Sequence, residues 1–214
     1  MDNGEASVPN RESGAPTVST GTIVLRAGLG ELPPACRRLS EISPWHAERA
    51  KAQDADMTNI RSASEDDIAT LATLTAIVHD AHAEHRPDIF ISAPPPEALE
   101  ALLMRQLADP CVTFLIAESA DGRPVGYAMA EVASRPGSAL TVPDLIISLR
   151  QIAVEPSASG GGVGSALLDR VRELGRAAGC RRLVTQVWDF NAGAHAFYLA
   201  SGLRPTTRTL DQEL

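Results

Sequence analysis

Residues 159–165, which read SGGGVGS, are the part of the chain whose composition points most directly to a chemistry. Glycine fills four of the five positions from Gly160 to Gly164, and a segment with helical spacing follows. A glycine inside a helix costs about 1 kcal/mol relative to alanine, so this many at the start of one need another reason. Backbone N–H groups at a helix N-terminus bind anions, and glycines remove the side chains that would hold an anion away. The segment therefore predicts an anion-binding loop.

Two common phosphate-binding motifs fit this loop poorly. A P-loop needs a lysine after its last glycine, whereas Ser165 follows Gly164 here. The dinucleotide fingerprint G-x-G-x-x-G could use Gly160 and Gly162, but its third position would be Ser165, and the loop lies late in the chain. A nucleotide-dependent oxidoreductase is therefore a distant alternative.

A third pattern fits better and extends over two segments. The stretch LRQIAVEPSASGGGVGSALL resembles the acyl-CoA-binding segment of the GNAT superfamily of N-acyltransferases, in which apolar-x-Val, x-Pro and R/Q-x-x-G-x-G/A follow one another. A second stretch, NAGAHAFYLASGLRP, resembles the family's N-x-x-A-x-x-x-Y-x-x-x-G-F/L segment. The matching residues are Val154, Pro156, Gly162 and Gly164 in the first stretch and Asn191, Ala194, Tyr198 and Gly202 in the second. Upstream, HAEHRPDIF and VGYAMAEV look like the acceptor-side helix region and third strand of many members, so the resemblance covers about 57–214.

The resemblance implies acetyl-CoA as the acyl donor and no metal. In the family, the pyrophosphate lies on the glycine-rich backbone, and the pantetheine arm pairs with a strand that a bulge separates from its neighbour. The residues expected to contact the donor are Ile152, Ala153, Val154, Ser159, Gly160, Gly161, Gly162, Val163, Gly164, Ser165 and Asn191. Ser159 stands where Arg or Gln is usual, and Gly160 and Gly161 replace basic residues. Donor binding is therefore expected to rest more on the backbone.

The resemblance also suggests the groups that move protons. Tyr198 matches the residue that can protonate the departing thiolate, although a tyrosine packed in the core beside Phe197 is the alternative. N-terminal-amine acetyltransferases of the family have a glutamate base five residues before the matching Asn191, and here that position is Gln186, which cannot take a proton. Glu131, late in a predicted strand, is the candidate base, and a solvated strand glutamate is an equally good interpretation.

Three histidines, His79, His82 and His85, recur at every third position and raise a metal hypothesis. Side chains three residues apart do not stay on one face of a helix, and Pro87 ends the segment, which argues against a metal site. A helix end that faces the acceptor cleft is the preferred interpretation. Trp188 and Cys180 are expected to be packing residues, and Asn191 could cap a helix as well as touch the donor.

The predicted function is transfer of an acetyl group from acetyl-CoA to an amine, by direct attack in a ternary complex. Backbone N–H groups near Val154 are expected to stabilise the oxyanion. A degenerate acyl-CoA-binding regulatory module is the alternative, since Ser159 and Gln186 depart from the family pattern. The acceptor could be a small molecule or a peptide, because acceptor loops carry no transferable motif, and a homodimer is left open.

Composition limits the class of protein. The 214 residues are 44% hydrophobic and carry a net charge of −8, which argues against general binding to nucleic acid or anionic membranes. No long apolar run opens the chain, and three cysteines without metal-type spacing suit a reduced compartment, so a cytoplasmic location is expected.

The chain is expected to divide at Met57. Residues 1–56, rich in Gly, Ser, Pro and Thr at their start, are predicted to be a mostly disordered extension, and residues 57–214 the N-acetyltransferase domain. Met57 could be the natural initiator.

Within the domain, hydrophobic periodicity alternates between strand and helix. Strands are expected over 58–63, 111–119, 124–132, 144–154, 181–187 and 204–210, and helices over 64–86, 95–109, 163–178 and 192–201. The order predicts an α/β fold: a mixed, splayed GNAT-like sheet flanked by about four helices rather than a doubly wound one.

Overall fold

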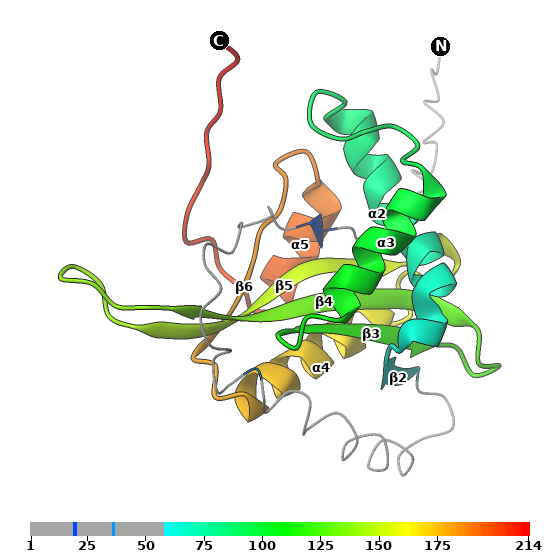
Figure 1. Ribbon diagram of the computed structural model, residues 1–214, viewed down its shortest axis with the longest axis horizontal. Helices are drawn as coiled ribbons and strands as arrows, with labels where there is room; N and C mark the ends of the chain where they lie inside the picture. The colour runs from blue at the N-terminus through cyan, green and yellow to red at the C-terminus, as the bar shows by residue number, and fades with distance from the viewer. Residues whose placement is uncertain (1–18, 21–35, 37–57) are drawn as a thin grey trace, which may run out of the picture.

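The computed structural model describes Ser19, Thr20, Cys36 and residues 58–214 (Figure 1). One mixed sheet has the strand order β1-β5-β4-β3-β2, and β6 also pairs with β5. Only the β5–β6 pair is parallel among these strands. The strands are β1 (Ser19–Thr20), β2 (Asn59–Ser62), β3 (Val112–Glu118), β4 (Pro124–Arg135), β5 (Asp144–Val154) and β6 (Arg182–Thr185). This arrangement confirms the predicted α/β class with a mixed, open sheet.

Helices cover both faces of the sheet, as Figure 1 shows for α2 and α3 above it and α4 below it. Two short 3-10 segments precede α2 and α4. The helical elements are η2 (Glu65–Asp67), α2 (Ile68–His85), α3 (Pro96–Leu107), η3 (Pro156–Ala158), α4 (Val163–Ala177) and α5 (Ala192–Ala200). The predicted number of about four α-helices is confirmed for the described residues.

Two hydrophobic clusters follow from the alternation of side chains along the strands. The α4 side collects Ala128, Ala130 and Val132 of β4 with Leu167 of α4 and Tyr198 of α5. Tyr127 and Met129 of β4 pack instead with Leu71 and Leu74 of α2 and Leu103 of α3. Since neighbouring β4 residues face opposite layers, the sheet is buried on both faces along its centre.

Helix α2 begins where the sequence predicts. Ser64 and Asp67 form a capping box, in which the Ser64 N–H donates to the Asp67 carboxylate at 2.8 Å, and the Ser64 hydroxyl donates to the same carboxylate at 3.1 Å. Arg61 of β2 donates two hydrogen bonds to the same carboxylate, at 2.7 and 2.8 Å, and this lowers the pKa of Asp67 to about 2. The first turn of α2 is thereby tied to the edge strand of the sheet.

The last predicted strand, over 204–210, is wrong. These residues have no regular secondary structure and are exposed. The sequence RPTTRTL offers no alternating apolar set to bury, and Pro205 has no N–H to donate to a ladder. β6 is also shorter than predicted and β4 longer, because β4 continues into a hairpin arm with β5 that projects from the sheet (Figure 1).

Most of the predicted N-terminal extension, 1–56, lies outside the described residues. The three that are described contact the domain: Ser19 and Thr20 pair with β5, and Cys36 forms a disulfide with Cys111. This disulfide contradicts the expectation that the cysteines are reduced. Cys180 keeps its thiol, and burial raises the pKa of that thiol to about 11, which fits a packing role.

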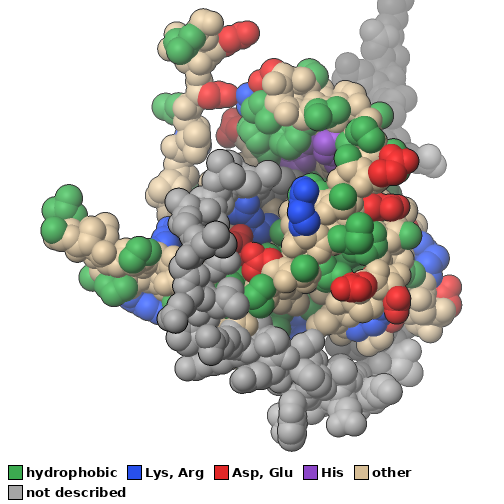
Figure 2. Space-filling model, viewed as in Figure 1, with side chains coloured by type: hydrophobic (Ala, Val, Ile, Leu, Met, Phe, Trp, Pro, Cys, Tyr) green, Lys and Arg blue, Asp and Glu red, His purple; other side chains and the backbone are tan. Residues whose placement is uncertain are grey.

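The distribution of charged side chains can be followed on one face of the molecule. On the face shown in Figure 2, acidic and basic side chains are interspersed, and no broad basic surface is seen. Within the described part of the chain, no helix has the length and apolar character needed to cross a membrane.

Candidate active site

The glycine loop leads from the end of β5 into α4. Gly160 and Gly162 have φ angles of 80° and 82°, the left-handed region that favours glycine, and Gly162 is the N-cap of α4. A Cβ added at either position would meet no atom within 4 Å, so the space beside both residues is open. The loop therefore turns tightly and exposes its backbone.

Several backbone N–H groups are available at this helix start. The Ala166 N–H donates to the Gly162 carbonyl at 3.0 Å, which is the first intrahelical bond of α4. The N–H groups of Val163, Gly164 and Ser165 precede that bond and have no acceptor within the helix. Together with the positive end of the helix dipole, they are the kind of donors that the predicted anion-binding loop requires.

An open pocket of about 230 Å³ lies at this loop. Its lining is Val154, Ala158, Ser159, Gly160, Gly162, Gly164, Ser165 and Phe197. Most of the residues predicted to contact acetyl-CoA thus line one pocket. The others lie close by: Ile152 and Ala153 are buried in β5, Val163 packs into the core, and Gly161 turns between Ala158 and the helix. Phe197 is an addition, and a Cβ on Gly164 would lie 3.5 Å from its ring.

A bulge in β5 opens the sheet beside the pocket. Ala130 of β4 pairs with Leu149 and Met129 pairs with Gln151, so Arg150 is the extra residue. β6 pairs with β5 only as far as Leu149, opposite Thr185. Beyond the bulge, β5 and β6 separate, which is the splayed arrangement that the resemblance implies.

The separated edge of β5 carries β1. Ser19 pairs with Ile152 and Thr20 with Gln151, in antiparallel register. This is the same edge on which the sequence predicts the pantetheine arm. A backbone partner can therefore add to β5 at this point.

Tyr198 lies on α5 and packs in the cluster on the α4 side of the sheet, and Asn191 is the N-cap of α5. Tyr198 is 4% exposed and belongs to the same cluster as Val154 and Val163 of the glycine loop region. Its ring centroid lies 5.1 Å from that of Phe197, which lines the pocket. The Asn191 side chain accepts from the Ala194 N–H at 2.8 Å, so its predicted role as a helix cap is confirmed.

Glu131 lies on the opposite face, toward α2. Its Oε2 is 3.8 Å from Nε of Arg150, and the two side chains are 24% and 12% exposed. Gln186 follows the end of β6 and is exposed. Tyr198 and Glu131 therefore belong to different layers of the fold.

The C-terminal end of α2 is surrounded by rings. His82 packs against Phe90, Trp188 and Phe190, with centroids 5.0 to 6.3 Å apart, and His85 stacks on Phe190 at 4.4 Å. Figure 2 shows histidine atoms beside hydrophobic ones in this region. The end of α2 therefore contacts the loop between β6 and α5.

Each of the three histidines has a ring nitrogen within hydrogen-bond distance of a backbone carbonyl. Nδ1 of His82 and of His85 lie 2.7 and 2.9 Å from the carbonyl oxygens of Val78 and Ala81. Nε2 of His79 lies 2.6 Å from the Ile91 carbonyl. No cluster of His, Cys, Asp and Glu suited to a metal ion occurs among the residues that the structure describes.

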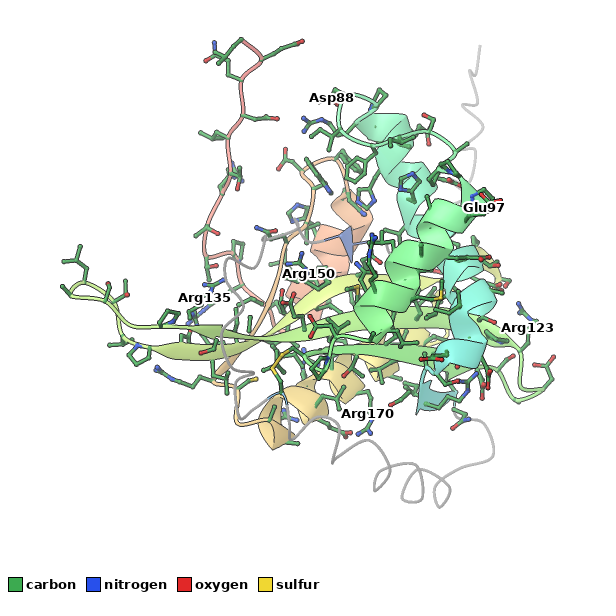
Figure 3. All side chains as sticks on the ribbon, viewed as in Figure 1. Asp88, Glu97, Arg123, Arg135, Arg150 and Arg170 are labelled. Carbon is green, nitrogen blue, oxygen red and sulfur yellow. A yellow bond between two sulfur atoms is a disulfide. The ribbon has the colours of Figure 1, made fainter. Side chains whose placement is uncertain are left out.

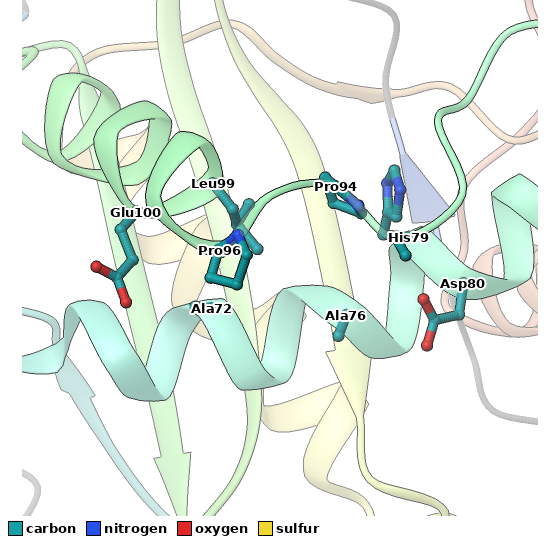
Figure 4. Close-up of a pocket in the computed structure, with 9 residues that line it drawn as sticks. Ala72, Ala76, His79, Asp80, Pro94, Pro96, Leu99 and Glu100 are labelled. Atoms are coloured by element: carbon teal, nitrogen blue, oxygen red, sulfur yellow. The ribbon is translucent and has the colours of Figure 1, made fainter.

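A second pocket, of about 250 Å³, lies between α2 and the start of α3 (Figure 4). Ala72, Ala76 and Leu99 form much of its floor, and His79 and Glu100 stand at its two ends. It shares no lining residue with the glycine-loop pocket. The two are separate depressions on opposite layers of the fold.

A model of the Acetyltransferase (GNAT) family matches residues 76–203, more than half of the sequence. The chain belongs to the acetyltransferase (GNAT) family. The family predicted from the two motifs is thereby confirmed, and the matched range contains the glycine loop, the β5 bulge and α5. None of the curated proteins matches the sequence.

Solved structures show the same GNAT fold. A crystal structure of a mutant of the BH1408 protein from Bacillus halodurans is 25% identical, has a TM-score of 0.66, and covers 73% of this chain and 99% of its own. Aminoglycoside N-acetyltransferase AAC(6')-Iy in complex with CoA is 22% identical and has a TM-score of 0.59. The match covers 76% of this chain and 97% of that one. A predicted acetyltransferase with acetyl-CoA from Clostridium acetobutylicum is 17% identical and has a TM-score of 0.56. The match covers 73% of this chain and 96% of that one.

Sequence reasoning missed two residues of this region. Arg150 is charged within the otherwise mostly apolar strand DLIISLRQIAV, and that contrast is a signal in the sequence. Phe197 precedes the motif tyrosine, and nothing in its spacing distinguishes a pocket wall from core packing.

Proposed function

We propose that this GNAT protein transfers an acetyl group from acetyl-CoA to the amine of an acceptor. The observation that carries the proposal is the pocket at the start of α4, where left-handed Gly162 and the N–H groups of the first turn meet the end of β5 at Val154. A diphosphate fits such a backbone loop because it needs several N–H donors and no intervening side chains.

The donor would run from this loop along the free edge of β5. The diphosphate would lie on the 159–165 backbone, and the pantetheine arm would pair with Ile152 to Val154 in place of a strand. β1 supports this proposal, because a backbone segment is already accommodated on that edge, opposite Ile152. Asn191 would contact the donor while capping α5.

The reaction would be direct aminolysis of the thioester. The ammonium of the acceptor loses a proton to water or to Glu131, and the amine attacks the thioester carbonyl, forming a C–N bond. Backbone N–H groups near Val154 stabilise the oxyanion of the tetrahedral intermediate. When the C–S bond breaks, the thiolate takes a proton from Tyr198, which is later restored from solvent.

The acceptor is proposed to be a small-molecule or peptide amine. AAC(6')-Iy has been solved with a bisubstrate analogue, CoA-S-monomethyl-acetylneamine, which supports a small-molecule amine. We also propose that residues 57–214 are the catalytic domain and that residues 1–56 are an extension of it.

Two measurements test the function. Calorimetry with acetyl-CoA and with NADH should give binding of acetyl-CoA alone. Mass spectrometry of mixed amine pools after incubation with protein and acetyl-CoA should detect products heavier by one acetyl group. Binding without any acetylated product would favour the regulatory module, and absence of acetyl-CoA binding would overturn the proposal.

A further inference from the structure

The ion pair between Arg150 and Glu131 is unlike the others in the described part of the chain. Its closest atoms are 3.8 Å apart, whereas the closest atoms of each other pair are 3.0 Å apart or less. A separation of 3.8 Å is too long for a hydrogen bond. The two charges offset each other, but the two side chains do not form a hydrogen bond with each other.

The Arg150 guanidinium is mostly enclosed by the protein but makes no hydrogen bond with the described part of it. The Arg150 side chain is 12% exposed, and no hydrogen bond from its guanidinium is found to any residue in the described ranges. A guanidinium has five N–H donors, and none of the Arg150 nitrogens is among the fully buried atoms that lack a partner, so its donors stay within reach of water or a ligand. By contrast, Arg61 forms hydrogen bonds with both Asp67 and Glu118 although its side chain is 36% exposed. The donors of Arg150 are thus available to a ligand.

The backbone explains why Arg150 is held at this point. As the extra residue of the β5 bulge, it joins Gln151 on the face toward α2, where Tyr127 donates to Gln151 Oε1 at 2.7 Å. Glu131 shares this face with Met129 and Tyr127, because β4 alternates. In Figure 3, Arg150 lies over the middle of the sheet.

The position also relates the pair to the reacting atoms. Arg150 lies between the last β5–β6 pair, at Leu149, and the edge residues Gln151 and Ile152. If the donor arm lies along that edge, the thioester end is next to the bulge. An acceptor amine that reaches the thioester would then meet one cationic and one anionic side chain, about 4 Å apart.

We infer that the acceptor is a zwitterion of the amino acid class, with its carboxylate bound by Arg150 and its ammonium bound by Glu131. This inference rests on the proposed function and adds the acceptor's chemistry to it. The amine and carboxylate of an α-amino acid are close enough to bridge the two side chains, and each would complete hydrogen bonds that the pair lacks. The ammonium proton then passes to Glu131 before the amine attacks. A polycation such as an aminoglycoside would bring several ammonium groups against Arg150.

The first test compares acceptors on the wild-type protein. The probes are a mixture of the common amino acids, the same amino acids as carboxamides, and spermidine, each with acetyl-CoA and mass-spectrometric detection. We expect the free amino acids to be acetylated with kcat/KM at least about tenfold above their amides, since an amide removes the charge that Arg150 binds. Equal rates for acids and amides, preference for spermidine, or no acetylated amino acid would overturn the inference. Acetyl-CoA binding in the same sample would show that the proposed function itself had not failed.

The second test uses variants of the arginine. Arg150→Gln should lower kcat/KM for the preferred amino acid at least about tenfold and leave that for its amide unchanged, and Arg150→Lys should retain part of the activity. Arg105→Gln, at an exposed position on α3, is the matched control and should change neither. An equal loss with acid and amide for both Arg150 variants would mean that the arginine serves only the structure.

Discussion

The backbone of Ser19 pairs with that of Ile152 on the part of β5 that β6 leaves free. Thr20 pairs with Gln151 in the same ladder. The proposed pantetheine arm needs the same backbone groups, and one strand edge can pair with only one partner at a time. Donor binding is therefore expected to require that β1 leave this edge.

The first prediction follows for a chain that starts at Met57. It should fold cooperatively and bind acetyl-CoA more tightly than the full chain, because β1 no longer competes for β5. Calorimetry and thermal unfolding check both statements. The full chain in reducing buffer is a useful comparison, since reduction of the Cys36–Cys111 disulfide releases the tether without shortening the chain. Loss of cooperative unfolding in the shorter chain would show instead that residues 1–56 stabilise the domain.

The second prediction compares two glycines with the same backbone conformation. Gly162 and Gly179 have φ angles of 82° and 78°, and a Cβ at either would meet nothing within 4 Å. Alanine at either position should therefore cost about 1–2 kcal/mol of unfolding free energy. Only Gly162→Ala places a methyl group in the pocket, so it alone should weaken acetyl-CoA binding, by about tenfold or more. Equal affinities of the two variants would contradict the donor site.

The elements of the domain were predictable because their signals are local. Ser64 and Asp67 mark the start of α2, the Asp-Gly turn before Arg123 joins β3 to β4, and Gly179 ends α4 with φ at 78°. The position of the glycine loop at the start of α4 was equally readable, since its glycines lie in one contiguous stretch of backbone. These features depend on neighbours in sequence, and sequence order is what a motif records.

Features that join distant segments were not predictable. The pairing of β1 with β5 joins residues more than a hundred positions apart, and two residues carry no periodicity. The Cys36–Cys111 disulfide spans 75 residues, and three cysteines allow three pairings. The Arg150–Glu131 pair depends on a bulge that shifts the register of β5 by one residue. The prediction of a strand over 204–210 failed for a different reason, because RPTTRTL has no alternating apolar residues that a sheet could bury.

The third prediction concerns pH. His82 is 1% exposed, and burial lowers its pKa below the usual value of 6.5, with a smaller contribution from the nearby charges of His79 and His85. The unfolded chain therefore takes up a proton at His82 before the folded protein does. Unfolding free energy should fall as pH drops below about 6.5, by at most about 1.4 kcal/mol per pH unit, until the folded pKa is reached.

Denaturant titrations between pH 7.5 and 5 measure this slope. His82→Gln should flatten it, because glutamine keeps an N–H donor and does not titrate. His85→Gln removes an exposed histidine of the same helix and should leave most of the slope in place. A His82→Gln protein with the wild-type slope would assign the pH dependence to other groups.

The fourth prediction concerns the chemistry at Tyr198. If this residue only packs, Tyr198→Phe should be nearly silent, because the ring remains beside Phe197 and only the hydroxyl is lost. If it is the general acid, the thiolate must leave unprotonated or take a proton from water. We expect kcat to fall by roughly 10²–10⁴-fold with little change in acetyl-CoA affinity, since the loss falls on the transition state. Tyr127→Phe is the matched control: it removes a fully buried hydroxyl that donates to Gln151, so it should lower stability more than kcat. Single-turnover rates with the preferred acceptor, or slow hydrolysis of acetyl-CoA, provide the measurement. A Tyr198→Phe protein with the wild-type kcat and pH profile would assign Tyr198 to the core and leave protonation of the thiolate to solvent.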